Sequence, residues 1–378
     1  MQYSSHFHKI KPSASMQAGL LEDAHLYSNL AIGVSDLPPP TQLQSLIEDF
    51  AKQNYLPYVA SKGSKKARTN LSNIIFRNED VDPDEVVLVN GAKWGLHLAL
   101  MGILNPGDHV ILMEPYWLSY PEMISLQYAH FISWKPTVSV SGELSFHLDS
   151  LLALLETHKP KVLILNNPNN PSGMLFSKEF VDKVAQILHQ NGAWLIIDEV
   201  YKDLLFSRAD EKEFYSKGEN IIRIGSFSKS IASPGLRLGY IQAKQEFISF
   251  LDKMNQHMQT CVTGLSHFVM ENLDKQVYLD YVSYSSAIFH NRYLVLESSL
   301  KGSKFKHLKG SASFYALVNF SSFAASGEDA CKKLLSEYKI LATPGGAYGQ
   351  SFSEYVRVCL TVDEKKLKEI FEVLIAKS

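Results

Sequence analysis

The sequence contains only three cysteines, Cys261, Cys331 and Cys359, among its 378 residues. Their odd number and wide spacing exclude a disulfide framework and the paired motifs of a zinc site. So few cysteines are typical of a reducing compartment, and we expect a cytoplasmic protein. The thirteen histidines are mostly dispersed, and the one close pair, His6 and His8, lies in a polar tail, so we expect no metal site.

The sequence also lacks a strong net charge and a long hydrophobic run. Its formal net charge is -2, and we therefore expect neither nucleic acid nor an anionic membrane as a partner. No apolar run approaches the length that spans a bilayer, and residues 1–17 lack the apolar core of a signal peptide. The length exceeds the size at which a single core stops growing, which predicts a large domain and a smaller one.

Short apolar runs alternate with longer amphipathic segments from residue 84 to about residue 262. The runs, which we expect to be strands, are 86–90, 109–113, 130–134, 162–166, 193–197, 221–224 and 237–242. Segments of helical length and spacing lie between them, at 92–104, 117–127, 148–158, 177–191 and 245–258. The alternation predicts an α/β fold whose large domain has a mostly parallel seven-stranded sheet covered by helices.

The pattern changes after about residue 263. A long helical region at 264–301 is followed by a strand at 311–318, a helix at 327–338, a strand at 355–360 and a helix at 363–376. This order is typical of an α+β domain. We therefore expect residues 42–262 to form the large domain, and residues 1–41 together with 263–378 to form a smaller domain from both chain ends.

Polar or small residues directly follow five of the predicted strands. These clusters are 90–93, 115–117, 166–173, 198–201 and the loop that ends at Arg237. Ligands of open α/β sheets bind outside the carboxyl ends of the strands, so five such clusters predict a binding site there. In the last cluster, small hydroxyl residues suit an anion, and Lys229 with open space around it suits Schiff-base chemistry with a carbonyl cofactor. The alternative for that loop is a solvated basic segment.

Four motifs in this order resemble those of the fold-type I pyridoxal-phosphate aminotransferases of class I/II. They are Ser226-Phe227-Ser228-Lys229 with Pro234-Gly235-Leu236-Arg237, Asn170-Pro171-Ser172-Gly173, Asp198-Glu199-Val200-Tyr201 and Tyr355-Val356-Arg357-Val358. Order and spacing agree from about residue 33 to the C-terminus. Lys93 and residues 116–123 resemble the bacterial aspartate aminotransferase branch in particular.

The resemblance implies pyridoxal 5'-phosphate as the cofactor, with Lys229, Asp198 and Tyr201 as catalytic residues. Lys229 would hold the cofactor covalently and shuttle a proton, and Asp198 would pair with the pyridine nitrogen. Tyr201 and Asn170 would hydrogen-bond the phenolic oxygen. The alternatives are a helix N-cap for Asp198 and a simple turn at Asn170.

The resemblance also assigns residues to the cofactor's phosphate and ring. The phosphate would be held by Gly91, Ala92, Lys93, Ser226 and Arg237. Trp117 would stack on the ring, and Tyr58 would reach the phosphate of the neighbouring subunit, which implies a homodimer with shared active sites. The alternatives are a surface ion pair for Arg237, a core position for Trp117 and a loop position on its own subunit for Tyr58.

For the substrate, the resemblance implies that Arg357 binds the α-carboxylate and Gly33 lies over the bound molecule, beside Trp117 and Asn170. Gly33-Val34-Ser35-Asp36 departs from the family's Gly-x-Pro-Asp. Lys93 would meet a distal carboxylate, with a phosphate contact or a solvent-facing position as the alternative.

We therefore predict a transaminase that moves an amino group from an L-amino acid to a 2-oxo acid such as 2-oxoglutarate. Aspartate or glutamate is the favoured donor, and aromatic or methionine side chains are possible. The alternatives are a C–S lyase or another eliminating enzyme of the same fold, and a cofactor-binding sensor.

Overall fold

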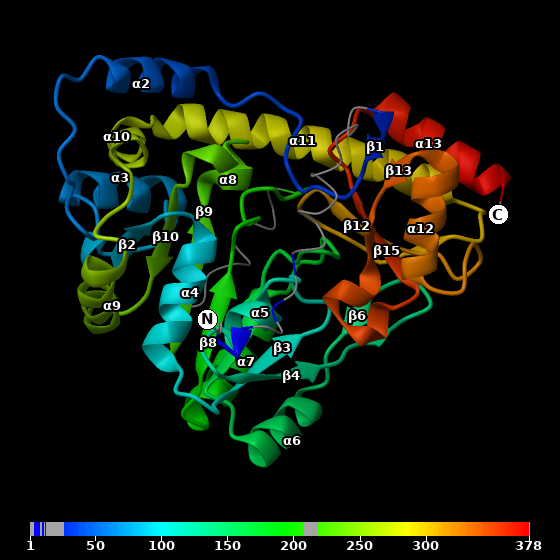
Figure 1. Cartoon of the computed structure of the whole chain (residues 1–378), viewed down its shortest axis with the longest axis horizontal. Helices are drawn as coiled ribbons and strands as arrows, with labels where there is room; N and C mark the ends of the chain where they lie inside the picture. The colour runs from blue at the N-terminus through cyan, green and yellow to red at the C-terminus, as the bar shows by residue number, and fades with distance from the viewer. Residues whose placement is uncertain (1–3, 8–9, 11, 13–25, 208–217, 378) are drawn as a thin grey trace.

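The computed structural model describes residues 4–7, 10, 12, 26–207 and 218–377. His8 and most of the expected N-terminal segment before residue 26 lie outside the described residues. Two sheets stand on either side of a central gap in the ribbon, and helix α11 (Lys275–Leu300) runs along both of them (Figure 1). Within the described ranges, no helix combines the length and the apolar character that crossing a membrane requires.

The seven predicted strands form one sheet in the order β2-β10-β9-β8-β7-β3-β4. Their bounds are β2 (Val86–Val89), β3 (His109–Met113), β4 (His130–Trp134), β7 (Val162–Asn166), β8 (Trp194–Asp198), β9 (Ile221–Ser226) and β10 (Gly239–Gln242). Strand β10 runs antiparallel to both neighbours, whereas β4, β3, β7, β8 and β9 pair in parallel. The expectation of a mostly parallel seven-stranded sheet is confirmed.

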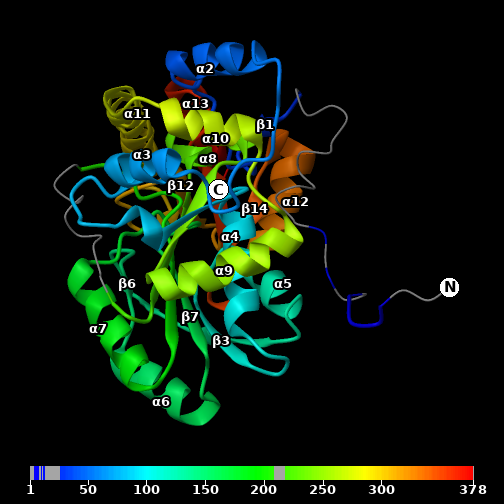
Figure 2. The same ribbon diagram turned by 90° about the vertical axis from the view of Figure 1, so that its left-hand side faces the viewer.

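Helices cover both faces of this sheet because its strands are apolar on both sides. Within β8, Ile196 packs into the core under α4, α5 and α9, whereas Leu195 and Ile197 pack toward α6 and α7. The bounds are α4 (Ala92–Ile103), α5 (Tyr120–Ser125), α6 (Leu148–His158), α7 (Lys178–Gln190) and α9 (Gln245–Met258). Figure 2 shows α4, α5 and α9 on one side of the sheet and α6 and α7 on the other.

Two helical predictions differ from the observed bounds. The helix expected at 117–127 begins only at Tyr120, which leaves Trp117 in a turn. The region expected to be helical over 264–301 is two helices, α10 (Gly264–Asn272) and α11. Asp274 separates them, because its carboxylate accepts the N–H groups of Gln276 and Val277 and so caps a new helix.

A second, antiparallel sheet has the order β11-β12-β15-β14. Its strands and the neighbouring β1–β13 pair are β1 (Ser28–Asn29), β11 (Lys306–His307), β12 (Tyr315–Asn319), β13 (Ile340–Leu341), β14 (Thr343–Pro344) and β15 (Tyr355–Cys359). Strand β1 pairs in parallel with β13, so the N-terminal segment joins the C-terminal part of the chain. A short hairpin of β5 (Thr137–Val138) and β6 (Leu144–Ser145) pairs with neither sheet, although Leu144 packs with Leu317 of β12.

Helix α11 contributes to two separate cores. Its second half packs against the small sheet together with α12 (Gly327–Tyr338) and α13 (Glu364–Ala376). Its first half packs with α2 (Thr41–Ala51), α3 (Lys65–Ile75) and α10 beside β2 and β10. The helix therefore ties the two sheets together on one side of the region where their polar strand ends meet.

Candidate functional site

A cavity of about 480 Å³ lies where the carboxyl ends of the large sheet's strands face the small sheet. Most of the residues singled out from the sequence line it: Gly33, Ala92, Lys93, Trp117, Asn170, Asp198, Tyr201, Ser226, Lys229, Arg237 and Arg357. These residues come from nearly the whole length of the chain. The predicted polar clusters lie together because the carboxyl ends of parallel strands meet at one edge of the sheet.

Lys229 lies on the short helix α8 (Phe227–Ser230), directly after β9. Ser226 caps this helix through the N–H of Ser228, which turns the chain at the sheet edge. The Nζ of Lys229 donates to the carbonyl of Gly33 at 2.6 Å. Burial lowers the pKa of Lys229 to about 8, and the guanidinium groups of Arg357 and Arg237 contribute less. Near neutral pH the amine is therefore far more often uncharged than an ordinary lysine, as a nucleophile requires.

Asp198 ends β8 and is only 5% exposed. Its Oδ2 accepts from the Tyr120 hydroxyl at 2.6 Å, and its Oδ1 accepts from the Val200 N–H at 3.2 Å. Burial raises the pKa of Asp198 to about 6, although both hydrogen bonds act in the opposite direction. A cationic partner in the cavity would favour the ionised form.

The end of the cavity to which the resemblance assigns the phosphate is built from three elements. Helix α4 begins at Ala92, which lines the cavity together with Ser226, and the Ser226 hydroxyl lies 2.7 Å from that of Ser228. The N-terminus of a helix favours an anion. Arg237 donates to the carbonyl of Asn90 at 3.2 Å. Gly91 is not among the lining residues, but a side-chain Cβ there would lie 2.4 Å from Arg237 Nη2. Glycine at this position therefore lets Arg237 approach the helix.

Arg357 on β15 is 2% exposed and held from several sides. It donates to Asn170 Oδ1 at 3.2 Å and to the carbonyl of Ala31. Its guanidinium carbon lies 4.5 Å from the ring centroid of Tyr315 and 5.2 Å from that of Tyr348. Its Nε finds no hydrogen-bond partner in the described part of the chain. Arg357 is thus a fixed cation with a donor to spare, which suits a carboxylate ligand.

Lys93 and Trp117 lie together on another wall of the cavity. The Lys93 Nζ is 5.0 Å from the Trp117 ring centroid. Burial lowers the pKa of Lys93, and the charge of Arg237 adds to this effect. A cation whose charged form is disfavoured in this way gains from an anionic ligand.

Tyr120 and Tyr315 are site residues that the sequence reasoning missed. Tyr120 orients Asp198, and the Tyr315 hydroxyl lies 3.1 Å from that of Tyr201. A Cβ on Gly33 would come within 1.7 Å of the Tyr315 hydroxyl, so only glycine fits above this ring. Neither tyrosine belongs to one of the recognised motifs, although Tyr120 lies within residues 116–123.

Tyr58 does not line the cavity of its own chain. Its side chain is 86% exposed, in a loop where Tyr55 and Leu56 are also exposed.

The described residues contain no group of three or more His, Cys, Asp or Glu side chains that could hold a metal ion.

Comparison with known proteins adds the family context. Residues 27–374 match the family described as aminotransferase class I and II. The chain is 28% identical to an aspartate aminotransferase of Thermotoga maritima, over 91% of this chain and 89% of the relative. It is also 28% identical to a probable aspartate/prephenate aminotransferase of Aquifex aeolicus, over 89% of this chain and 87% of the relative.

Solved structures show the same fold. Aspartate aminotransferase of Thermus thermophilus with maleate superposes with a TM-score of 0.89 at 23% identity, covering 100% of this chain and 99% of that chain. The Thermotoga maritima aspartate aminotransferase gives a TM-score of 0.88 at 26% identity, with 99% of each chain covered. The methionine aminotransferase YbdL of Escherichia coli gives a TM-score of 0.89 at 20% identity, with 100% of each chain covered.

Proposed function

The chain belongs to the class I and II aminotransferases, which are pyridoxal-phosphate enzymes, and from this premise we propose that it transfers the amino group of an acidic L-amino acid. Aspartate or glutamate is the favoured donor, and a 2-oxo acid such as 2-oxoglutarate is the acceptor. The observation that carries the proposal is that one cavity contains an amine of lowered pKa, a buried carboxylate and two further cations that suit carboxylates. Those two cations are Arg357 and Lys93.

The residues of the cavity fit the cofactor of the family. The amine of Lys229 matches an aldehyde, the carboxylate of Asp198 matches a protonated ring nitrogen, and the start of α4 with Ser226 and Arg237 matches a phosphate. When bound, pyridoxal phosphate supplies a carbonyl that takes up the amino group and a ring that accepts electrons from the substrate's α-carbon.

The side chains of the protein do the positioning and the proton transfer. Lys229 holds a proton at Nζ or passes it on, because its pKa of about 8 lies close to neutral pH. Asp198, oriented by Tyr120, would hold a proton at the ring nitrogen. Tyr201 and Asn170 would bind the cofactor's phenolic oxygen, and the Asn170 Nδ2 lies 3.5 Å from the Tyr201 hydroxyl. Trp117 would stack on the ring.

Arg357 and Lys93 fix the two ends of a dicarboxylic substrate. Arg357 takes the α-carboxylate, because its guanidinium is already oriented by Asn170 and by two tyrosine rings. Gly33 leaves room beside Tyr315 for the backbone to lie over the substrate. Lys93 takes the distal carboxylate, a choice supported by the relatives named aspartate aminotransferases.

Apolar residues of the same cavity would also accept a second class of donor. Trp117, Ile32 and Val34 line the cavity and offer surface to an aromatic or methionine side chain. The eliminating C–S lyase that shares these motifs is not favoured, since the curated relatives described above are named as aminotransferases.

We extend the proposal to assembly and domains. Tyr58 and its exposed neighbours Tyr55 and Leu56 would be covered by a second copy, with Tyr58 reaching the partner's phosphate site. Residues 42–262 would bind the cofactor, and residues 1–41 with 263–378 would close over the substrate. The location would be the cytoplasm, in keeping with three unpaired cysteines.

A covalent-attachment experiment tests the proposed chemistry. Protein loaded with pyridoxal phosphate is reduced with borohydride, digested and analysed by mass spectrometry. We expect the reduced cofactor on the peptide that contains Lys229 and none on a Lys229→Ala variant. Attachment at another lysine in the wild-type protein would contradict the proposal.

A further inference from the structure

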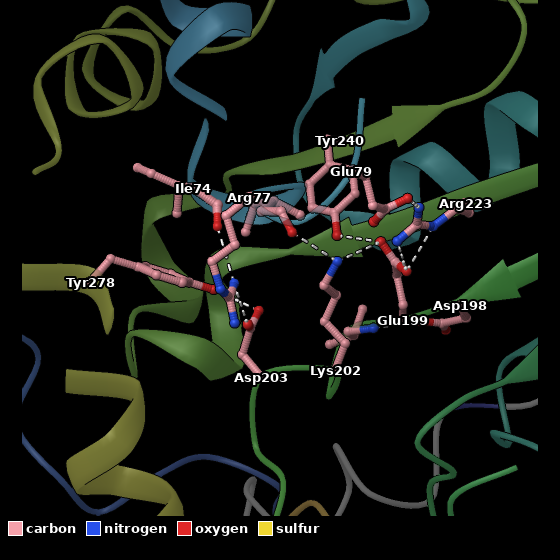
Figure 3. A network of polar contacts seen from close by, with 12 residues as sticks. Ile74, Arg77, Glu79, Asp198, Glu199, Lys202, Asp203, Arg223, Tyr240 and Tyr278 are labelled. Carbon is pink, nitrogen blue, oxygen red and sulfur yellow. Dashed lines mark hydrogen bonds and ion pairs between the residues drawn. The ribbon is translucent and has the colours of Figure 1, made fainter. Parts of the chain in front are cut away.

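Asp198 and Tyr201 belong to a turn whose other polar side chains point away from the cavity. The turn follows β8, and both residues line the cavity. The side chains on its other side are also buried, and they are Glu199, Lys202 and Asp203. Figure 3 shows Glu199 and Lys202 directed toward Arg223 and Tyr240, and neither side chain lines the cavity.

Both oxygens of the Glu199 carboxylate are held by neighbouring elements. Arg223 on β9 donates Nε and Nη2 to Oε2, each at 3.0 Å (Figure 3). Tyr240 on β10 donates its hydroxyl to Oε1 at 2.6 Å, and the Lys202 Nζ lies 3.6 Å from the same oxygen. Tyr240 reaches across Gly225, where a Cβ would lie 2.2 Å from its hydroxyl. The pairing of β10 with β9 therefore places the Tyr240 hydroxyl within hydrogen-bond distance of Glu199.

Two carboxylates share Arg223, and a second cation balances the charge. Arg223 Nη1 donates to Glu79 Oε2 at 2.7 Å. Lys202 donates to the carbonyl of Ile75 at 3.1 Å. The Phe76 ring lies against both cations, 4.9 Å from the Lys202 Nζ and 4.7 Å from the Arg223 guanidinium carbon. With Lys202 included, the network contains two acidic side chains, Glu79 and Glu199, and two basic ones, Arg223 and Lys202.

A buried ionic network of this kind contributes little to the free energy of folding. A buried ion pair is often no more stable than well-packed apolar side chains of similar volume, because the charges lose their hydration. Because Glu199 directly follows Asp198, the network is placed to affect the charge of Asp198 instead. Inside a protein, an unbalanced charge on Glu199 would oppose the ionisation of its neighbour.

The titratable groups of the described residues that face Asp198 and Glu199 come from four elements and their own turn. Asp198 is faced by Tyr120 of α5 and by Glu199 and Tyr201 of its own turn. Glu199 is faced by Arg223, Tyr240 and Lys202, with Glu79 behind Arg223. At the far end of the turn, Asp203 has its own partners: Arg77 at 3.3 Å and the Tyr278 hydroxyl at 2.7 Å (Figure 3).

We propose that Lys202 and Arg223 are positioning residues that hold and neutralise Glu199, so that the turn presents an ionised Asp198 and a fixed Tyr201 to the cofactor. This inference rests on the proposed pairing of Asp198 with the ring nitrogen. The loss of Glu199 and the loss of Lys202 then have opposite electrostatic effects on Asp198. Glu199→Gln removes a negative charge, whereas Lys202→Met leaves one carboxylate without its balancing cation.

The test measures the affinity for pyridoxal phosphate between pH 5 and pH 8 in each variant. We expect the acid midpoint of binding to move down in E199Q and up in K202M, each by about one pH unit, which is tenfold in proton affinity. The double variant E199Q/K202M returns toward the wild-type midpoint. Leu151→Ala, a core change on α6 and remote from the site, lowers stability without moving the midpoint.

The outcomes separate this inference from the proposed function. Midpoints that stay unchanged, or that move in the same direction in E199Q and K202M, overturn the inference. If K202M does not fold, Lys202→Gln removes the same charge while retaining a polar group. If Asp198→Asn keeps the wild-type affinity and pH profile, the proposed role of Asp198 itself fails. If D198N loses the pH dependence while E199Q and K202Q leave it unchanged, only the inference fails.

Discussion

The hydroxyl of Tyr120 donates a 2.6 Å hydrogen bond to the Oδ2 of Asp198. Tyr120 lies at the start of α5 and Asp198 at the end of β8, so the bond joins a helix on one face of the sheet to the edge where the cavity opens. Both side chains are buried. The carboxylate is therefore oriented before any ligand arrives.

Tyr120→Phe should weaken cofactor binding. The pKa of Asp198 is about 6, because burial raises it more than this hydrogen bond lowers it. Loss of the hydrogen bond should therefore raise the pKa of Asp198 further and reduce its ionised fraction. We expect pyridoxal phosphate to bind about tenfold more weakly at pH 7, the usual effect of one hydrogen bond to a charged group. Tyr128→Phe, at an exposed position, serves as the control and should bind normally. Equal affinities in all three proteins would refute the role of Tyr120.

Lys93→Met should change donor choice rather than general activity. The ammonium group lies beside Trp117, and if it pairs with a distal carboxylate as proposed, its loss affects only donors that carry one. We expect kcat/KM for aspartate to fall about 10- to 100-fold, while the value for phenylalanine changes by less than about threefold. An equal fall for both donors would assign Lys93 to the cofactor or to the fold instead.

Lys229→Met should stabilise the cofactor-free protein at neutral pH. Burial lowers the pKa of Lys229 in the folded state to about 8, below its ordinary value of 10.5. The folded state therefore binds its proton less tightly than the unfolded state. The resulting cost is fully present below about pH 8 and disappears as the pH rises toward 10.5. At pH 7 it amounts to roughly 3 kcal/mol.

Urea unfolding of the two apo proteins at pH 7 and pH 10.5 measures this effect. The variant should be more stable at pH 7, and its advantage should shrink at the higher pH. A difference that does not depend on pH would show that the lysine is not destabilised by burial.

The dimer proposal predicts complementation between two impaired chains. Lys229→Ala lacks the reacting amine, and Tyr58→Phe lacks the hydroxyl assigned to the partner's phosphate. If Tyr58 acts across the interface, a hybrid dimer contains one site with both wild-type residues, and mixed chains regain activity. If Tyr58 acts within its own chain, no site in the hybrid has both residues. Activity after co-refolding, compared with each chain alone, decides between the two arrangements.

The large sheet was predictable because its strands are continuous apolar runs with helical segments between them. In β8, every second residue packs on the opposite face, so each run must be apolar throughout to be covered on both sides. The break between α10 and α11 was not predictable from the apolar pattern. It depends on the Asp274 cap, a local contact within an otherwise helical sequence.

The lining of the site was predictable where parallel strands end, because the topology collects those ends in one place. Asp198 and Lys229 are of this kind. Tyr120 and Tyr315 were not, since they approach from α5 and β12 and their contacts depend on how those elements pack. The partners of Glu199 also became visible only in three dimensions, because Arg223 and Tyr240 come from separate strands.

The half-reaction with a panel of amino acids tests the central claim most directly. Enzyme loaded with pyridoxal phosphate is mixed with aspartate, glutamate, phenylalanine or methionine in single turnovers, without an oxo acid. We predict that aspartate and glutamate react fastest, that aspartate yields one oxaloacetate per site with no release of ammonia, and that 2-oxoglutarate then restores the starting spectrum. A faster reaction with phenylalanine or methionine than with aspartate and glutamate, or release of pyruvate and ammonia from an added S-alkylcysteine without an acceptor, would contradict the account.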